Sequence, residues 1–317
     1  MRVLSQAQTV QYLPFDRLIP ALEEAFRQGC EVPLRHNHSI RGGKADEDGI
    51  LLLMPAWQPG KRIGVKTVSI FPNNHAQGLP GLHSVFILYD AITGAPLAIL
   101  DGDAITSRRT AAASALAAKY LSRPDASTLL VVGAGRVGSL LPEAYASIRP
   151  IQQVRVWDRN SAASEQMACT LRGQGISAEA VKDLEQAARS ADIITCATLS
   201  TEPLIQGEWL APGTHLDLIG SFTPDMRESD EACLHRSTVF IDTPEALMKA
   251  GDLLTPIKAG SFVADHVAAT LESLCRLTHP GRTSADEITV FKAVGTALED
   301  LAAASMAYDA FLVEHAH

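Results

Sequence analysis

The glycine-rich turn GAGRVG, residues 133–138, constrains this 317-residue chain more than any other feature of its sequence. It follows the apolar run LLVV and precedes a segment of helical pattern, which is the strand–turn–helix context of a dinucleotide-binding fold. Gly133 permits the tight turn, Gly135 lets the backbone approach a pyrophosphate, and Gly138 lets the helix pack closely on the strand. The turn therefore predicts a dinucleotide site with the phosphates at a helix N-terminus.

An acidic residue beyond the turn supports this interpretation. Asp158 ends the next predicted strand, where its carboxylate would accept hydrogen bonds from the adenosine ribose hydroxyls. Asp158 favours NAD(H) by repelling a 2′-phosphate, whereas the neighbouring Arg159 would attract that phosphate or stack on the adenine. NAD(H) and NADP(H) are therefore both candidate cofactors. A similar sheet that binds a flavin, or no ligand, is the alternative.

Strand and helix patterns alternate over residues 123–295. Such alternation predicts an α/β fold of the Rossmann type, with a doubly wound parallel sheet. The strand candidates are residues 127–133, 153–158, 192–198, 214–220 and 237–243.

The pattern upstream of residue 123 is different and predicts an α+β domain. Residues 16–29 carry apolar side chains at helical spacing, with Asp16 as a candidate N-cap and Gly29 at the C-terminal end. From Ala293 the tail is again helical, and it would pack back on this domain. The extended runs are residues 50–55, 62–70, 84–90 and 96–100, and an alanine-rich helical connector covers residues 106–123.

Composition and charge exclude several classes of protein. With 27 basic and 36 dispersed acidic residues the net charge is −9, which gives no support to binding of nucleic acid or an anionic membrane. No apolar run reaches the roughly 18 to 20 residues that span a bilayer, so we expect a cytoplasmic protein with a small-molecule partner. The five cysteines, without a CxxC pair or a histidine at metal-ligand spacing, predict buried thiols rather than disulfides or a metal site.

The chain also contains several longer characteristic segments. They are VPLRHNHSI, GVKTVSIFPNN followed by GLPG, TGAPLAILDGDAITSRRTAAASALAAKYL, GAGRVG, IGSFTPDMRE and VFKAVGTALEDLAAA. Together they resemble the ornithine cyclodeaminase and mu-crystallin family of nicotinamide-dependent enzymes over nearly the whole chain. The resemblance implies a substrate-binding and dimerisation domain, residues 1–122 with 296–317, an NAD(P)-binding Rossmann domain, residues 123–295, and a homodimer formed through the first domain.

The resemblance maps a substrate clamp onto Arg35 in VPLRH, Lys66 in GVKTV and Arg109 in SRRTA. Three cations suit the carboxylate of a small anionic, amino-acid-like substrate, because arginine offers a bidentate fork and lysine a point charge. Lys66 is also the candidate catalytic residue, since its charge would steady negative charge near the reacting carbon. A solvated surface role is the alternative, although Lys66 in an apolar strand and Arg109 on an alanine-rich helix need a specific reason for their charge.

The resemblance also extends the predicted cofactor site beyond the glycines. It implies contacts to the nicotinamide half from residues that follow the strands and from a turn before the C-terminal helix. The alternative is that these residues only cap helices and form turns. The candidate cofactor-binding residues are Gly133, Gly135, Arg136, Val137, Asp158, Arg159, Thr198, Gly220, Ser221, Val294 and Gly295.

Residues 220–222 depart from the pattern of the cyclodeaminases proper. There the loop reads like GGD or GAD and its Asp serves as the acid/base, whereas this chain has Gly220, Ser221 and Phe222, and a phenyl ring cannot transfer a proton. GLPG departs too, because members often carry Thr where this chain has Gly81. The segment GSFTPDMRE is similar instead to the branch that reduces cyclic ketimines, such as Δ1-pyrroline-2-carboxylate and Δ1-piperideine-2-carboxylate, to proline and pipecolate.

We therefore predict an NAD(P)H-dependent reduction of a cyclic ketimine carboxylate. The alternatives are an ornithine cyclodeaminase that uses bound NAD+, an amino-acid dehydrogenase acting for instance on alanine, and a non-catalytic crystallin-like binding protein.

Water would suffice as the proton donor for this reduction. The acids of MRESDE are interpreted as the polar start of a helix rather than as a replacement acid. His83 is the favoured histidine because it follows the GLPG loop, and a structural or surface role is the alternative for each histidine. The other side chains weighed as donors are Asp225, Glu228, Asp230, Glu231, His36, His38 and His75.

Overall fold

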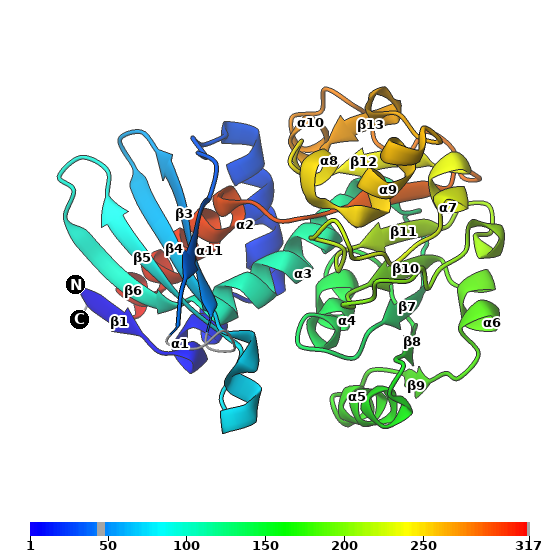
Figure 1. Ribbon diagram of the computed structural model, residues 1–317, viewed down its shortest axis with the longest axis horizontal. Helices are drawn as coiled ribbons and strands as arrows, with labels where there is room; N and C mark the ends of the chain where they lie inside the picture. The colour runs from blue at the N-terminus through cyan, green and yellow to red at the C-terminus, as the bar shows by residue number, and fades with distance from the viewer. Residues whose placement is uncertain (43–47, 316–317) are drawn as a thin grey trace. The chain divides into compact units, whose positions relative to one another are not determined.

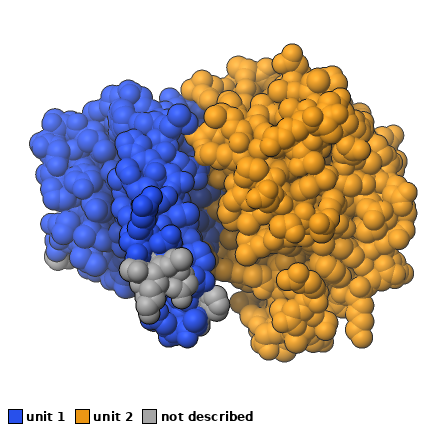
Figure 2. Space-filling view, in the orientation of Figure 1, with its two compact units in different colours: residues 1–109, 296–317 blue, residues 110–295 orange. Residues whose placement is uncertain are grey.

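The computed structural model describes residues 1–42 and 48–315 and divides the chain into two compact units (Figures 1 and 2). The first unit contains Met1–Arg109 and Thr296–His317, and the second contains Thr110–Gly295. The division falls inside helix α3 (Gly102–Leu121), whereas the sequence analysis ends the first domain after that helix, at residue 122. The second half of α3 belongs to the second unit, where Ser114 Oγ donates to Asp217 Oδ1 at 3.2 Å.

A six-stranded sheet forms the core of the first unit, in the order β1-β6-β5-β4-β3-β2 (Figure 1). Neighbouring strands are antiparallel except for β1 and β6, which are parallel. The four predicted extended runs are strands, whereas β1 and β2 are absent from the sequence prediction. The bounds are β1 (Arg2–Leu4), β2 (His36–Ile40), β3 (Gly49–Gln58), β4 (Arg62–Ile70), β5 (Leu82–Asp90) and β6 (Pro96–Asp101).

Two helices, α2 (Phe15–Gln28) and α11 (Ala297–Glu314), pack together in the first unit, and α11 also contacts β3, β4 and β5. The prediction that the C-terminal helix packs back on this part of the chain is confirmed. The prediction of Asp16 as N-cap is wrong, because Pro14 holds that position and Asp16 lies in the first turn, where its charge favours the helix dipole. Gly29 ends α2 at a φ of 76°, which glycine adopts without strain. The shorter helices are α1 (Gln6–Gln11) and the 3-10 helix η2 (Pro72–Gln77).

An eight-stranded sheet forms the second unit, in the order β13-β12-β14-β11-β10-β7-β8-β9, and all its neighbouring strands are parallel. This confirms the predicted Rossmann-type sheet. Three strands, β9, β13 and β14, are absent from the sequence prediction, and β14 lies in the interior between β11 and β12. The bounds are β7 (Thr128–Val132), β8 (Gln153–Trp157), β9 (Ala178–Ala180), β10 (Ile193–Cys196), β11 (His215–Leu218), β12 (Thr238–Ile241), β13 (Val267–Thr270) and β14 (Thr289–Lys292).

The helices of the second unit connect these strands. Within the described part of the chain, no helix combines the length and apolar character needed to cross a bilayer. The α-helices are α4 (Leu141–Ala146), α5 (Ser161–Gly173), α6 (Leu184–Arg189), α7 (Glu231–His235), α8 (Ala246–Lys249), α9 (Gly251–Ala259) and α10 (Leu271–Cys275), and the 3-10 helices are η3 (Gly138–Leu140), η4 (Gly207–Trp209) and η5 (Ala264–His266).

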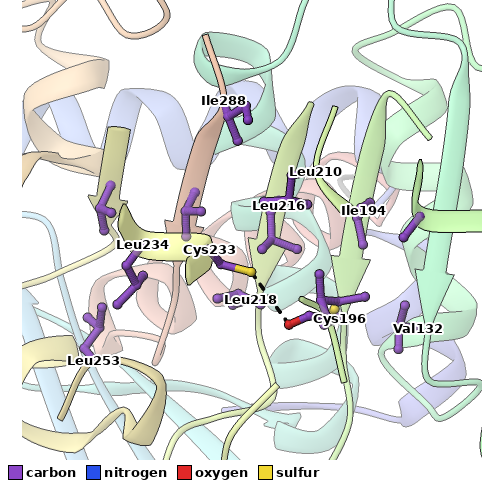
Figure 3. Close-up of a cluster of buried hydrophobic side chains, with 14 of the residues drawn as sticks. Val132, Ile194, Cys196, Leu210, Leu216, Leu218, Cys233, Leu234, Leu253 and Ile288 are labelled. Atoms are coloured by element: carbon purple, nitrogen blue, oxygen red, sulfur yellow. Dashed lines mark hydrogen bonds between the residues drawn. The ribbon is translucent and has the colours of Figure 1, made fainter. Parts of the chain in front are cut away.

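The core of the second unit gathers buried aliphatic side chains from its parallel strands, together with Cys196 and Cys233 (Figure 3). The thiol of Cys233 donates to the carbonyl oxygen of Ile205 at 3.7 Å. Cys196, Cys233 and Cys275 are buried as predicted. The same prediction is wrong for Cys169, which is exposed, and Cys30 is only partly buried.

Candidate functional site

The glycine turn after β7 has the geometry of a phosphate-binding loop. Gly133 adopts a φ of 106°, and a Cβ there would lie 2.7 Å from the carbonyl oxygen of Ala197. A Cβ at Gly138 would overlap the carbonyl oxygen of Gly133, so the start of the helical segment packs against the turn. A Cβ at Gly135 would meet no atom within 4 Å, which leaves open space above the backbone. A dinucleotide pyrophosphate fits this combination of two crowded glycines and one open glycine.

The carboxylate of Asp158 is fastened to the same turn. Its Oδ2 accepts from the backbone N–H of Ala134 at 2.7 Å, and its Oδ1 accepts from that of Asn160 at 2.8 Å. Each oxygen has two lone pairs, so these bonds leave acceptor capacity for ribose hydroxyls. Asp158 is half-buried, as is Val137, while Arg136 and Arg159 are exposed. Cofactor binding by these four residues stays a prediction.

The loops after β10 and β11 are joined by one buried carboxylate, that of Glu228. Its Oε1 accepts from the Thr198 backbone N–H at 2.7 Å and from the Thr198 hydroxyl at 2.8 Å, and its Oε2 accepts from the Gly220 N–H at 2.6 Å. Burial raises the pKa of Glu228 to about 7, against the opposing charge of Lys292 and the bonds from Thr198. Glu228 therefore ties together two loops that carry predicted cofactor-binding residues.

This position corrects the interpretation of MRESDE as the polar start of a helix. Asp230 does cap α7, since its side chain accepts from the Cys233 N–H, but Glu228 is fully buried. The sequence held one usable signal, because Glu228 lies at the end of a segment shared with the family resemblance rather than in an isolated acidic run.

The segment between Gly220 and Glu228 is anchored at both ends. The Ser221 hydroxyl donates to the Met226 carbonyl oxygen at 2.6 Å and accepts from the Asp252 N–H at 3.1 Å, while Asp252 Oδ1 accepts from the Glu228 N–H at 2.9 Å. Ser221 is buried, so its side chain holds the loop in shape. Phe222 is 46% exposed, which places an apolar ring on the loop surface after β11.

Val294 and Gly295 form the turn between β14 and α11. Their backbone N–H groups donate to Asp242 Oδ2 at 2.7 and 2.6 Å, and burial raises the pKa of Asp242. Asp242 is absent from the sequence prediction of the site, because it follows a short apolar strand and carries no local signal of burial. Asp242 thus fixes a turn that was itself predicted to contact the cofactor.

Two predicted substrate-binding cations lie together in the first unit. Lys66 Nζ is 2.7 Å from Asp300 Oδ2 and donates to the Thr106 hydroxyl at 3.2 Å. Arg109 Nε donates to Asp300 Oδ1 at 2.9 Å, and its Nη1 donates to Glu299 Oε2 at 2.7 Å. All four charged side chains are buried. These ion pairs supply a structural reason for cations on an apolar strand and an alanine-rich helix, so their role toward a substrate is a proposal.

The third predicted cation, Arg35, is half-buried and electrostatically coupled to Lys66, since its charge lowers the pKa of that lysine. The histidines weighed as proton donors are less favourably placed. His36, His38 and His83 are exposed, and the side chain of His75 lies outside the described residues.

Glu299 and Asp300 are absent from the sequence prediction. Acidic residues on a helix usually face solvent, and the local sequence of residues 297–300, ALED, predicts exposed acids. A signal was present, because both acids lie in a largely apolar helix while Lys66 and Arg109 lie in other apolar elements. Buried charges need partners of opposite sign, so these residues could have been matched.

Removing the Glu228 carboxylate is expected to flatten the pH dependence of stability. An acid whose pKa rises on folding contributes stability below its unfolded value of 4.5 and loses it as pH rises through about 7. Between pH 5 and 7.5 the wild type should therefore lose about 2 kcal/mol of unfolding free energy that Glu228→Gln does not lose. Urea unfolding at several pH values measures this difference. Asp225→Asn, which changes an exposed acid on the same loop, should follow the wild type; parallel curves for all three proteins would refute the expectation.

Comparisons with known proteins agree with this geometry. Residues 1–314 match the sequence model of the Ornithine cyclodeaminase/mu-crystallin family. A curated Delta(1)-pyrroline-2-carboxylate reductase of Paracoccus denitrificans is 39% identical over 89% of this chain and 89% of its own length. Thermococcus litoralis Delta(1)-pyrroline-2-carboxylate reductase, solved in complex with NADH and L-proline, aligns with a TM-score of 0.92 and 32% identity over 100% of this chain and 98% of its own. An archaeal alanine dehydrogenase dimer with bound NAD aligns with a TM-score of 0.90 and 30% identity over 99% and 97% of the two chains.

Proposed function

The chain belongs to the ornithine cyclodeaminase/mu-crystallin family, and we propose that it reduces a cyclic ketimine carboxylate with NADH or NADPH. The proposed substrates are Δ1-pyrroline-2-carboxylate and Δ1-piperideine-2-carboxylate, and the products are proline and pipecolate. The observation that carries this proposal is the loop after β11, where exposed Phe222 stands instead of an acid. The relatives that act on pyrroline-2-carboxylate support it.

Phe222 favours reduction over cyclodeamination because the two reactions differ in their demand for proton transfer. Cyclodeamination oxidises the amino acid, expels ammonia and then reduces the product, so it needs an acid/base beside the reacting carbon. Reduction of an imine that is already formed needs one hydride and one proton. Water can give that proton, and a phenyl ring on the loop leaves this simpler reaction intact.

The cations of the first unit would bind the substrate carboxylate. Lys66 Nζ makes an ion pair with Asp300 and a hydrogen bond to the Thr106 hydroxyl, while Nε and Nη1 of Arg109 donate to Asp300 and Glu299. The other N–H groups of both residues would donate to the substrate carboxylate, together with Arg35. Lys66 would also steady negative charge near the reacting carbon. This arrangement would orient the imine and restrict its motion, which is the main contribution that a protein makes to hydride transfer.

The second unit would hold the cofactor, whose nicotinamide ring supplies the hydride when bound. The open backbone at Gly135 would receive the pyrophosphate, and Asp158 would accept from the ribose hydroxyls. The loops joined by Glu228 and the turn fastened to Asp242 would fix the nicotinamide half. The proposed cofactor-binding residues are Gly133, Gly135, Arg136, Val137, Asp158, Arg159, Thr198, Gly220, Ser221, Val294 and Gly295.

We also propose a homodimer formed through the sheet of the first unit. On β4 the side chains alternate, so that Gly64, Lys66 and Val68 are buried on the face that α11 covers, while Ile63 and Val65 are only half-buried on the other. Val85 on β5 is 44% exposed. An apolar sheet face of this kind is typical of a surface that a second copy covers. The dimeric state of the archaeal relative supports this assembly.

The purified chain is expected to oxidise NADH or NADPH in the presence of pyrroline-2-carboxylate or piperideine-2-carboxylate. The loss of reduced-nicotinamide absorbance measures the rate, and chromatography identifies proline or pipecolate. Ornithine with NAD+ should release little ammonia. Rapid conversion of ornithine without turnover of cyclic imines would identify a cyclodeaminase instead. Preferential use of pyruvate with ammonia would identify an alanine-type dehydrogenase, the second candidate that the archaeal relative supports.

A further inference from the structure

One carboxylate in the first unit is shared by two cations. Asp300 Oδ2 lies 2.7 Å from Lys66 Nζ, and Asp300 Oδ1 accepts from Arg109 Nε at 2.9 Å. The Asp300 side chain has no exposed surface. Lys66 comes from β4, Arg109 from α3 and Asp300 from α11, so a single side chain joins three elements that are distant in sequence.

We propose that Asp300 is a positioning residue, whose carboxylate holds Lys66 and Arg109 in one fixed arrangement and keeps Lys66 cationic for binding of the substrate carboxylate. This inference rests on the proposed function, because it assigns Asp300 a role toward the two proposed substrate-binding cations. Asp300 would not itself touch the substrate. Its contribution would be to the orientation and the charge of groups that do.

Glu299, the adjacent residue on α11, differs from Asp300 in the cations with which it pairs. It is equally buried and accepts from Arg109 Nη1 at 2.7 Å, but the ion pair of Lys66 is made with Asp300. Within the part of the chain that the structure describes, Arg109 therefore pairs with two carboxylates and Lys66 with one. Loss of either acid would remove one buried negative charge, but only loss of Asp300 would leave Lys66 without its ion pair.

The surroundings of Lys66 make its charge depend on Asp300. Its neighbours across the sheet are Met54 on β3 and Phe86 on β5, neither of which carries a charge. Burial and the positive charges of Arg109 and Arg35 lower the pKa of Lys66, and Asp300 opposes them, so that the pKa is about 8. Asp300 itself is held in the charged form, since Lys66 and Arg109 outweigh the effect of burial and lower its pKa.

The consequence is a defined change in pH dependence. Lys66 loses its positive charge as pH rises through its pKa, so substrate capture should decline on the alkaline side of about 8. Without Asp300, burial and the positive charges of Arg109 and Arg35 would still favour the neutral amine, while the negative charge of Glu299 on α11 would remain beside Arg109. An opposite charge at this distance typically shifts a pKa by about one to three units.

The test compares Asp300→Asn with Glu299→Gln in the full chain. The rate of pyrroline-2-carboxylate reduction gives the pH profile of kcat/KM, and the 13Cε resonance of Lys66, assigned with Lys66→Met, reports its protonation directly. For Asp300→Asn we expect both transitions to move to lower pH by about one unit or more. For Glu299→Gln we expect kcat/KM to fall while both transitions stay at the wild-type pH. Asp300→Glu, which keeps the charge, should restore most of the wild-type profile.

Unchanged Lys66 titration in Asp300→Asn, or an equal shift in both variants, would overturn the proposal. If Asp300→Asn does not fold, the wild type still decides the question, because the Asp300 carboxyl resonance should respond at the pH where Lys66 titrates. A carboxyl resonance that is insensitive to that titration would overturn it too. Since the resonances are read without substrate, a chain that titrates as expected but ignores cyclic imines would separate failure of the proposed function from failure of this inference.

Discussion

Gly135→Val is expected to abolish binding of NADH and NADPH while the chain stays folded. A Cβ at Gly135 meets no atom within 4 Å, so the protein itself tolerates a side chain there. The added isopropyl group would occupy the space proposed for the pyrophosphate and keep it from the loop amides. Each charge-assisted hydrogen bond lost costs about 1.5 to 3 kcal/mol, so losing two or more should raise the dissociation constant by about a hundredfold or more.

Fluorescence titration with NADH measures this loss, and thermal unfolding followed by circular dichroism measures the fold. Gly173→Val is the matched control, because Gly173 at the end of α5 also has no atom within 4 Å of its ideal Cβ position. It should bind NADH like the wild type. Gly138→Val should instead lower the melting temperature, since its Cβ would overlap the Gly133 carbonyl oxygen. Wild-type affinity in Gly135→Val would place the dinucleotide elsewhere.

The second unit could be predicted largely from local sequence. Long apolar runs, regularly interrupted by helical segments, mark β7, β8, β10, β11 and β12, and the glycine turn fixes where the first of them ends. Strand β14 was not predicted because it carries Lys292, a charged residue that usually indicates exposure. In the structure Lys292 is fully buried and donates to the Leu218 carbonyl oxygen at 2.9 Å, and its Nζ lies 3.7 Å from Asp252.

The candidate site was predictable only for residues whose chemistry is visible in a local motif. Gly133, Gly135 and Asp158 belong to such a motif, and Lys66 is conspicuous within its apolar strand. Glu228 and Asp300 act on groups far away in sequence, so no local pattern shows what they contact. Their roles follow from pairing in three dimensions. A buried charge needs a partner of opposite sign, but the sequence does not show which residue that partner is.

The two proposed substrate-binding cations, Lys66 and Arg109, are expected to respond differently to replacement by methionine. Arg109→Met would remove the ion pairs that Arg109 makes with both Glu299 and Asp300, so that two buried carboxylates lose a partner at once. Breaking a buried ion pair from one side typically costs about 3 to 5 kcal/mol. We expect a loss of this size in the free energy of unfolding by urea. The double variant Arg109→Met/Glu299→Gln should recover part of it, because it also removes the negative charge of the buried Glu299 carboxylate. A stable Arg109→Met with an unstable double variant would contradict this charge-balance argument.

Lys66→Met is therefore the cleaner test of substrate binding, because Asp300 keeps its bond to Arg109 and methionine replaces most of the lysine stem. We expect a smaller loss of unfolding free energy than in Arg109→Met, because Arg109 still pairs with both acids. The kcat/KM for pyrroline-2-carboxylate should fall by about tenfold to more than a hundredfold, the effect of losing one charged hydrogen bond of about 1.5 to 3 kcal/mol. NADH affinity should not change, since the proposed cofactor residues lie in the second unit. Lys61→Met, which removes an exposed lysine at the turn before β4, should keep full activity. Full kcat/KM in folded Lys66→Met would leave Lys66 with its structural ion pair alone and assign capture of the carboxylate to other cations.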